Sequence, residues 1–120
     1  MRFVNLPHVT VVGLYCSPKV PQEHLGLTLS ELLNKQSLHS SACLFIGDFN
    51  VNWFNQSKRV TLYDIFTRNH YRQIVSCATN NSKTCIDLIF TNLPEMQISF
   101  LILETYFSDH KGVCALINCF

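Results

Sequence analysis

The hydrophobic residues of the chain gather in short runs, and the spacing within each run predicts a strand or a helix. Residues 9–16 are β-branched and aromatic, which favours a strand, and residues 2–5 are placed to form a hairpin with it. Residues 42–47 are apolar without alternation, as in a strand that is covered on both faces. Strands are therefore expected at all three positions.

Two other segments have helical spacing. In the first, leucines recur at i, i+4, i+7 and i+8, which forms one apolar stripe of an amphipathic helix. These leucines are Leu25, Leu29, Leu32 and Leu33. A second stripe of three apolar residues lies between Arg59 and Asn69, with Ser57 or Asn55 as the expected N-cap. Both stripes are interpreted as core-facing surfaces.

The second half of the chain is dominated by strand-like segments. Apolar runs at 72–78, 85–92, 98–104 and 112–119 are separated by segments rich in turn residues. No internal repeat and no linker interrupts the pattern. We therefore predict one α/β domain over residues 1–120.

Composition narrows the class of protein. A chain of 120 residues with 48% hydrophobic residues can bury one core, and its apolar runs are too short to span a bilayer. No secretory cleavage pattern follows residues 1–14. The formal charge of +1 neither indicates nor excludes a polyanionic partner. A globular protein without a membrane partner is expected.

The six cysteines contain no C-x-x-C pair and mostly lie within apolar runs. This arrangement is unlike a disulfide framework or a zinc site, so we interpret the cysteines as reduced core residues. Reduced cysteines favour an intracellular location, which would be nuclear for a protein acting on genomic DNA. The cysteines are Cys16, Cys43, Cys77, Cys85, Cys114 and Cys119.

Polar groups follow the strand at 42–47 directly. If the backbone stays extended, Asp48 and Asn50 project from the same face, and Gly47 allows a close approach to the backbone. Ligands bind beyond the carboxyl ends of strands in open α/β sheets, which makes this pair a candidate site. The alternative is a simple turn, because Asp and Asn are common turn residues.

A second carboxylate interrupts the apolar strand at 85–92. Asp87 needs a partner there if it is ionised, and His110, next to Asp109 in a later loop, is the obvious candidate. A hydrogen bond between Asp87 and His110 would fix the ring tautomer and favour imidazolium. Three carboxylates, an amide and an imidazole then suit Mg²⁺ or Mn²⁺ and phosphate-ester cleavage.

Four motifs stand in a recognisable order along the chain: "VVGLYCSP", "GDFN", "T-x-IDLIFTN" and "SDH". Together they resemble the endonuclease/exonuclease/phosphatase superfamily, and more narrowly the apurinic-type endonuclease domain of non-LTR retrotransposons. The resemblance implies an α/β fold that is part of a four-layer, DNase I-like sandwich, with strands and two covering helices. It implies that residues 1–120 are the C-terminal portion of that domain.

The resemblance also implies roles for individual residues. Asp48 would hold and deprotonate the attacking water, and Asn50 would orient it. Asp109 would ligate the metal, and His110 would donate to a phosphate oxygen. Tyr15 would contact the phosphate, unless it is simply a core or rim aromatic.

In the family pattern an upstream half supplies a metal-binding glutamate and one of the two sheets. Residues 1–14 contain no Asp or Glu, so this half is expected to be missing and one strand face to be exposed. The isolated chain would then lack a metal ligand that catalysis needs. The missing half, or a reverse transcriptase domain of a longer polyprotein, is the expected protein partner.

Three functions are compatible with these residues. The first is a Mg²⁺-dependent endonuclease that nicks DNA, with Arg59 and Arg72 touching the nucleic acid unless they only form a solvated face. The others are a phosphatase acting on inositol phosphates or lipids, and a catalytically inactive binding module or fragment. Trp53 and Phe54 either wedge against a base or pack in the core, and packing is favoured.

Overall fold

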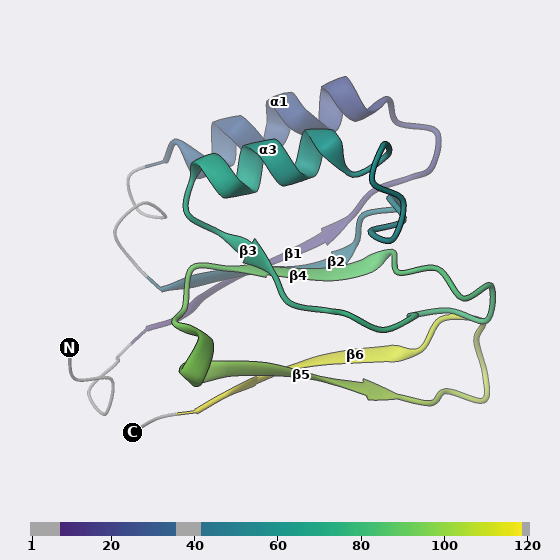
Figure 1. Cartoon of the computed structure of the whole chain (residues 1–120). Coiled ribbons are helices and arrows are strands. Elements are labelled where there is room, and N and C mark those ends of the chain that lie inside the picture. Colours follow the sequence, from purple (N-terminus) through teal and green to yellow (C-terminus); the bar gives the residue numbers. More distant parts are fainter. Residues whose placement is uncertain (1–7, 36–41, 119–120) are drawn as a thin grey trace.

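The computed structural model describes residues 8–35 and 42–118, and these form three layers (Figure 1). Helices α1 and α3 cover one face of a four-stranded sheet, and a two-stranded sheet lies against the other face. The predicted α/β class, with two helices covering strands, is confirmed. The elements are β1 Thr10–Tyr15, α1 Gln22–Leu33, β2 Cys43–Asp48, α3 Val60–Arg68, β3 Arg72–Gln73, β4 Asp87–Thr91, the 3-10 helix η2 Glu95–Gln97, β5 Ile98–Leu103 and β6 Gly112–Ile117.

The larger sheet has the strand order β1-β2-β4-β3. Strands β1 and β2 are parallel, which requires a crossover connection, and α1 lies in that connection. Strand β4 then pairs antiparallel with both β2 and β3. The carboxyl ends of β1 and β2 consequently meet the beginning of β4 at one end of the sheet.

The main core fills the space between the helices and this sheet. Phe66 of α3 stacks on Phe90 of β4, with ring centroids 3.8 Å apart, and Phe45 meets Phe66 edge to face. Leu29 and Leu33 of α1 are buried in the same cluster, so the leucine stripe is a core-facing surface as predicted. Burial of large apolar and aromatic side chains is the dominant stabilising contribution in such a layer.

Strand β2 is covered on both faces, as its unbroken apolar run predicts. Cys43 and Phe45 point towards the helices, whereas Leu44 joins Leu93 and Ile98 in a second cluster on the opposite face. Alternate residues of a strand point to opposite faces, so the residues of one short strand contribute to both clusters. Every second residue of β2, ending at Asp48, therefore faces the β5–β6 sheet.

The strand predicted at 72–78 is wrong beyond its first two residues. Strand β3 ends at Gln73, and the side-chain amide of Gln73 then hydrogen-bonds the backbone of the segment that follows. Its Oε1 accepts the backbone N–H of Val75 at 2.6 Å, and its Nε2 donates to the carbonyl of Val75 at 2.8 Å. Side-chain amides compete with the strand ladder in this way, and no periodicity reveals it.

The predicted N-cap of the second helix is also wrong. Arg59 occupies the N-cap position of α3 with helical backbone angles, and no side chain caps the helix. Asn55 instead accepts the backbone N–H groups of Ser57 and Lys58, at 3.1 and 3.2 Å. The Asn55 side chain therefore stabilises a separate turn before α3 and does not cap the helix itself.

The cysteine prediction holds in part. Cys43 and Cys85 are buried, and burial raises the pKa of the Cys85 thiol to about 12, so it remains a thiol. Cys16 and Cys114 are half-buried, but Cys77 is exposed and is not a core residue. All five cysteines of the described part of the chain are free.

The outer face of the β5–β6 hairpin carries apolar side chains that reach solvent. Leu101 and Leu103 of β5 and Leu116 of β6 are each more than two-fifths exposed. The described residues therefore include an exposed strand face, as expected. No helix within residues 8–35 and 42–118 combines the length and hydropathy of a membrane span. The predicted hairpin with residues 2–5, and Cys119, lie outside the described residues.

Candidate active site

Three polar side chains form a row across the larger sheet. Tyr15, the last residue of β1, pairs with Asp48, the last residue of β2, and Asp48 pairs with Asp87, the first residue of β4. Residues directly opposite one another in neighbouring strands project to the same face. The row therefore lies on the face towards the β5–β6 sheet, at the end of the larger sheet where strands β1 and β2 finish.

His110 approaches this row from the loop before β6. Its Nδ1 lies 3.0 Å from Asp87 Oδ2, and its Nε2 lies 3.9 Å from Asp48 Oδ2. The predicted hydrogen bond between Asp87 and His110 is thus present. Each carboxylate side chain is only 16% exposed, whereas the imidazole is 37% exposed and remains accessible from outside.

Thr79 connects the two halves of this site, and the sequence analysis missed it. Its buried hydroxyl accepts the backbone N–H groups of Ile86 and Asp87, each at 3.1 Å. Its carbonyl accepts the N–H of Lys111 at 2.8 Å, directly after His110. Thr79 therefore positions the start of β4 through its hydroxyl and the histidine loop through its backbone carbonyl. Its only sequence signal is a threonine beside a turn-rich segment.

The surroundings shift the pKa values of two groups upward. Burial raises the pKa of the Asp48 carboxyl, the hydrogen bond from the backbone N–H of Asn50 opposes the rise, and the Asp87 charge adds to it. The hydrogen bond to Asp87 raises the pKa of His110, and the charges of Asp48 and Asp109 act in the same direction. Asp48 is therefore a stronger base than an ordinary aspartate, and His110 keeps its proton to higher pH.

Asn50 does not continue the strand, so of the two interpretations of this segment the turn is the one that the structure shows. Its φ of 51° is left-handed, which an asparagine tolerates better than most residues. Its backbone N–H donates to Asp48 Oδ1 at 2.9 Å, and its side chain donates to the carbonyl of Cys16. The segment is a turn and also part of the site, because Asn50 orients the carboxylate through its backbone.

Asp109 lies beside the cluster but outside it. Its side chain is exposed, and its carbonyl accepts the N–H of Asn81 at 2.9 Å. Asp48, Asp87 and His110 alone, among the described residues, offer ligand atoms that all lie within 4.8 Å of one another. A metal-ligating role for Asp109 stays a prediction.

The donor set of the cluster suits a hard divalent cation. Mg²⁺ is commonly bound through one or two carboxylates while it keeps several waters and takes substrate phosphate oxygens. Asp48 and Asp87 supply two such carboxylates, and Asp87 uses one oxygen for His110. His110 Nδ1 is already engaged by Asp87, so the two carboxylates are the residues that would hold the ion.

A family model described as "endonuclease-reverse transcriptase" matches residues 9–114. The chain belongs to this family. It is an endonuclease/exonuclease/phosphatase-type domain of the kind found in retrotransposons. The match includes every residue of the row, the histidine loop and both helices. Comparison with curated proteins found no match to this chain, and comparison with solved structures found none either.

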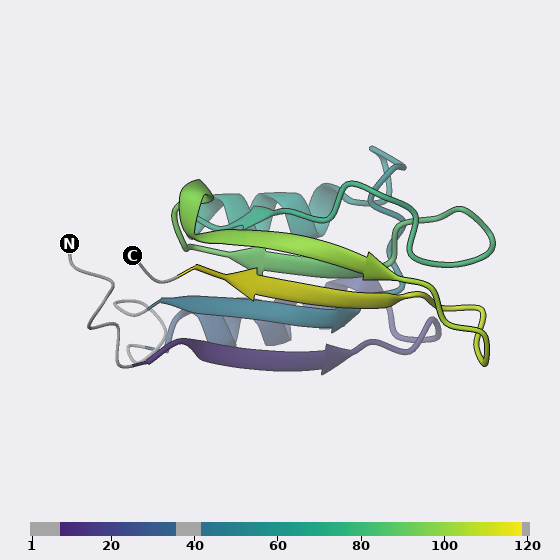
Figure 2. The same cartoon turned by 90° about the horizontal axis from the view of Figure 1, so that it is seen from below.

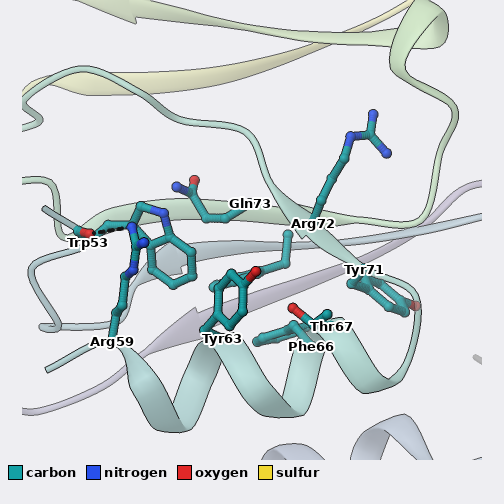
Figure 3. A pocket seen from close by; sticks show the side chains of 9 residues that line it. Trp53, Arg59, Tyr63, Phe66, Thr67, Tyr71, Arg72 and Gln73 are labelled. Carbon is teal, nitrogen blue, oxygen red and sulfur yellow. Dashed lines mark hydrogen bonds between the residues drawn. The ribbon is translucent and has the colours of Figure 1, made fainter. Parts of the chain in front are cut away.

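The two arginines predicted to bind nucleic acid lie outside the candidate cluster of Asp48, Asp87 and His110. They line a pocket of about 420 Å³ between α3 and the sheet (Figure 3). The guanidinium of Arg59 lies 5.1 Å from the ring of Trp53 and donates to its carbonyl at 3.1 Å. Arg72 donates to the carbonyl of Leu93, and Figure 3 shows its head group turned away from Arg59.

The structure separates the roles of Trp53 and Phe54, which follow the "GDFN" turn. Trp53 packs against Phe90 with ring centroids 5.4 Å apart, so the favoured packing interpretation is confirmed for it. Phe54 is about half exposed and does not follow that interpretation. Arg59 already has aromatic partners, and nucleic-acid binding by Arg59 or Arg72 stays a prediction.

In the metal-free endonuclease-reverse transcriptase domain, Asp87→Asn is expected to lower the pKa of His110 towards its ordinary value of 6.5. The hydrogen bond to the Asp87 carboxylate is the main cause of the raised value, and an amide has no charge to favour imidazolium. Titration of His110 by NMR in the native chain and the variant measures this shift. An unchanged pKa would show that the pairing is not electrostatically significant.

Proposed function

We propose that this domain hydrolyses phosphodiester bonds of DNA with the help of Mg²⁺ or Mn²⁺. The observation that carries the proposal is the close placement of Asp48, His110 and Asp87 in a member of this family. A partly buried base beside a histidine that hydrogen-bonds a carboxylate is an arrangement that serves water activation at a phosphate.

Asp48 is the proposed general base. Its raised pKa suits it to accept a proton from water, and Asn50 holds one of its oxygens, leaving Oδ2 towards the cluster. The water oxygen forms a bond to phosphorus as its proton passes to Asp48, and the bond from phosphorus to the departing sugar oxygen breaks. Positioned proton transfer of this kind contributes about 10²- to 10⁴-fold to a rate.

His110 is the proposed electrostatic partner of the phosphate. Its Nδ1 is engaged by Asp87, so its Nε2 is the nitrogen left to donate to a phosphate oxygen as negative charge develops there. Tyr15, which is 73% exposed at the end of the row, is the proposed second contact, with its hydroxyl donating to a neighbouring phosphate oxygen. These two donors would hold the phosphate next to Asp48.

A divalent metal, when bound, would supply Lewis-acid stabilisation of the phosphate and the leaving oxygen. Asp48 and Asp87 offer oxygen ligands on the inside of the site, and Asp109 offers an exposed carboxylate next to His110. The reverse transcriptase named in the family description is the proposed partner domain, and genomic DNA, in the nucleus, is the proposed substrate.

The proposal is tested by conversion of supercoiled plasmid to the open-circular form. The sequence predicts that an upstream metal ligand is missing, but Asp48 and Asp87 offer oxygen ligands in its place. We therefore expect nicking in Mg²⁺ or Mn²⁺, none in EDTA, and loss of nicking in His110→Ala. The matched control is His24→Ala, which changes an exposed histidine of α1. Release of phosphate from inositol phosphates or phospholipids without nicking would replace the nuclease with a phosphatase. Metal-independent nicking, nicking that survives in His110→Ala, or no activity on any substrate would contradict the proposal.

A further inference from the structure

The loop that carries His110 also carries the two most exposed large hydrophobic side chains of the described residues. Tyr106 is 97% exposed and Phe107 is 89% exposed. They are adjacent in the chain, and no core cluster includes either of them. Aromatic rings are costly to leave in water, so two neighbouring exposed rings mark a binding surface more than a packing accident.

The loop that presents these rings is closed at its base. Lys111 Nζ lies 3.2 Å from Glu104 Oε1, which bridges the ends of β5 and β6. Within the loop, Thr105 donates to the carbonyl of His110, and the N–H of His110 donates to the Ser108 hydroxyl at 3.1 Å. The aromatic pair therefore lies on a loop whose C-terminal part is fixed at the candidate site by the contact of His110 with Asp87.

The position of the loop connects it to the candidate site. Figures 1 and 2 show it at the end of the molecule where β1 and β2 finish, which is the end that carries Tyr15 and Asp48. His110 is three residues after Phe107 and hydrogen-bonds Asp87. A polymer whose phosphate lies at His110 would bring its neighbouring groups over this loop.

We propose that Tyr106 and Phe107 stack on nucleobases next to the phosphate that the site cleaves. The inference rests on the proposed nuclease function and specifies whether the bases at the cleavage site are paired. Bases within a duplex expose only their edges, so stacking on these rings requires an unpaired base or a step that opens easily. The domain is therefore expected to prefer DNA with an unpaired or distorted segment at the cleavage site.

Binding without cleavage tests the inference in the full chain. Fluorescence anisotropy in EDTA compares a fully paired duplex with a duplex that has a central unpaired segment containing 2-aminopurine. The variants are Tyr106→Ser/Phe107→Ser, the ring-preserving Tyr106→Phe/Phe107→Tyr, and Leu27→Ser as a control at a 72% exposed position of α1. Plasmid nicking in Mg²⁺ is measured on the same proteins.

Loss of both rings is expected to weaken binding to the unpaired substrate about 30-fold or more, because stacking of a base on each ring contributes to the affinity. The change in 2-aminopurine fluorescence on binding should disappear, while Tyr106→Phe/Phe107→Tyr and Leu27→Ser behave as the native chain. Unchanged affinity and fluorescence in the serine variant would overturn the inference, even if nicking continues and the nuclease function stands.

The two proposals can fail separately. Stacking without nicking in the native chain would contradict the nuclease function and leave base binding by the aromatic pair supported. If the serine variant instead changes the oligomeric state in light scattering while DNA affinity is unaltered, the rings form a protein contact, and the inference is overturned.

Discussion

Asp48→Asn is expected to reduce nicking by roughly 10²- to 10⁴-fold while leaving the fold at least as stable as the native one. The amide cannot accept the proton of the attacking water. It can still accept the N–H of Asn50 that Asp48 Oδ1 accepts at 2.9 Å, so the local turn is preserved. The loss would therefore report on the chemistry and not on unfolding.

The stability of this variant has a predictable dependence on pH. Burial places the folded-state pKa of Asp48 above its ordinary value of 3.8, so the stability linked to its protonation is present below that value. This stability is lost as pH rises through the folded-state pKa. Asparagine does not titrate, so the unfolding temperature of the variant relative to the native chain should rise between about pH 4 and pH 7.

Circular dichroism melts at both pH values, together with plasmid nicking in Mg²⁺, measure these effects. Asp64→Asn is the matched control, because Asp64 is exposed on α3 and away from the cluster. It should change neither activity nor the pH dependence of stability. Native-level nicking by Asp48→Asn would remove Asp48 as the base.

Gly47→Ala is expected to destabilise the domain by about 3 kcal/mol or more, or to prevent folding. A Cβ atom at Gly47 would lie 1.8 Å from the carbonyl oxygen of Leu14 on the paired strand, and the φ of +155° is unfavourable for a side chain. The contact is with backbone, which cannot move without separating β1 from β2. The pairing of Tyr15 with Asp48 follows directly after this point.

Gly13→Ala provides the matched control on the neighbouring strand. A Cβ atom there meets nothing within 4 Å, so the change in the free energy of unfolding should stay within about 1 kcal/mol. Urea unfolding followed by circular dichroism measures both variants. Comparable stability of the two alanine variants would show that β1 and β2 do not approach as closely as described.

Several elements of this domain could be predicted because their causes are local. The leucine stripe of α1 and the unbroken apolar run of β2 each reflect which faces must be buried. The partnership of Asp87 with His110 was predictable for a related reason. A carboxylate placed at an apolar strand needs a compensating group, and few candidates existed along the chain.

The failed predictions involve groups whose partners are distant or whose side chains replace backbone pairing. Gln73 ends β3 early by binding the backbone of Val75. At Asn50, where the sequence left a strand and a turn open, the side chain donates to the distant carbonyl of Cys16. Asn55 does not cap α3 because it accepts the backbone N–H groups of Ser57 and Lys58. Each outcome depends on a hydrogen bond that periodicity does not describe.

By itself, the sequence determined the secondary-structure types, the family and the set of polar residues from which a site could be built. Only the tertiary structure decided the register that aligns Tyr15, Asp48 and Asp87 in one row and the position of Thr79 between two loops. The tertiary structure also places Asp109 outside the cluster of Asp48, Asp87 and His110. The physical reason is that strand register and loop docking depend on the fit between segments far apart along the chain, whereas strand and helix patterns depend on neighbours.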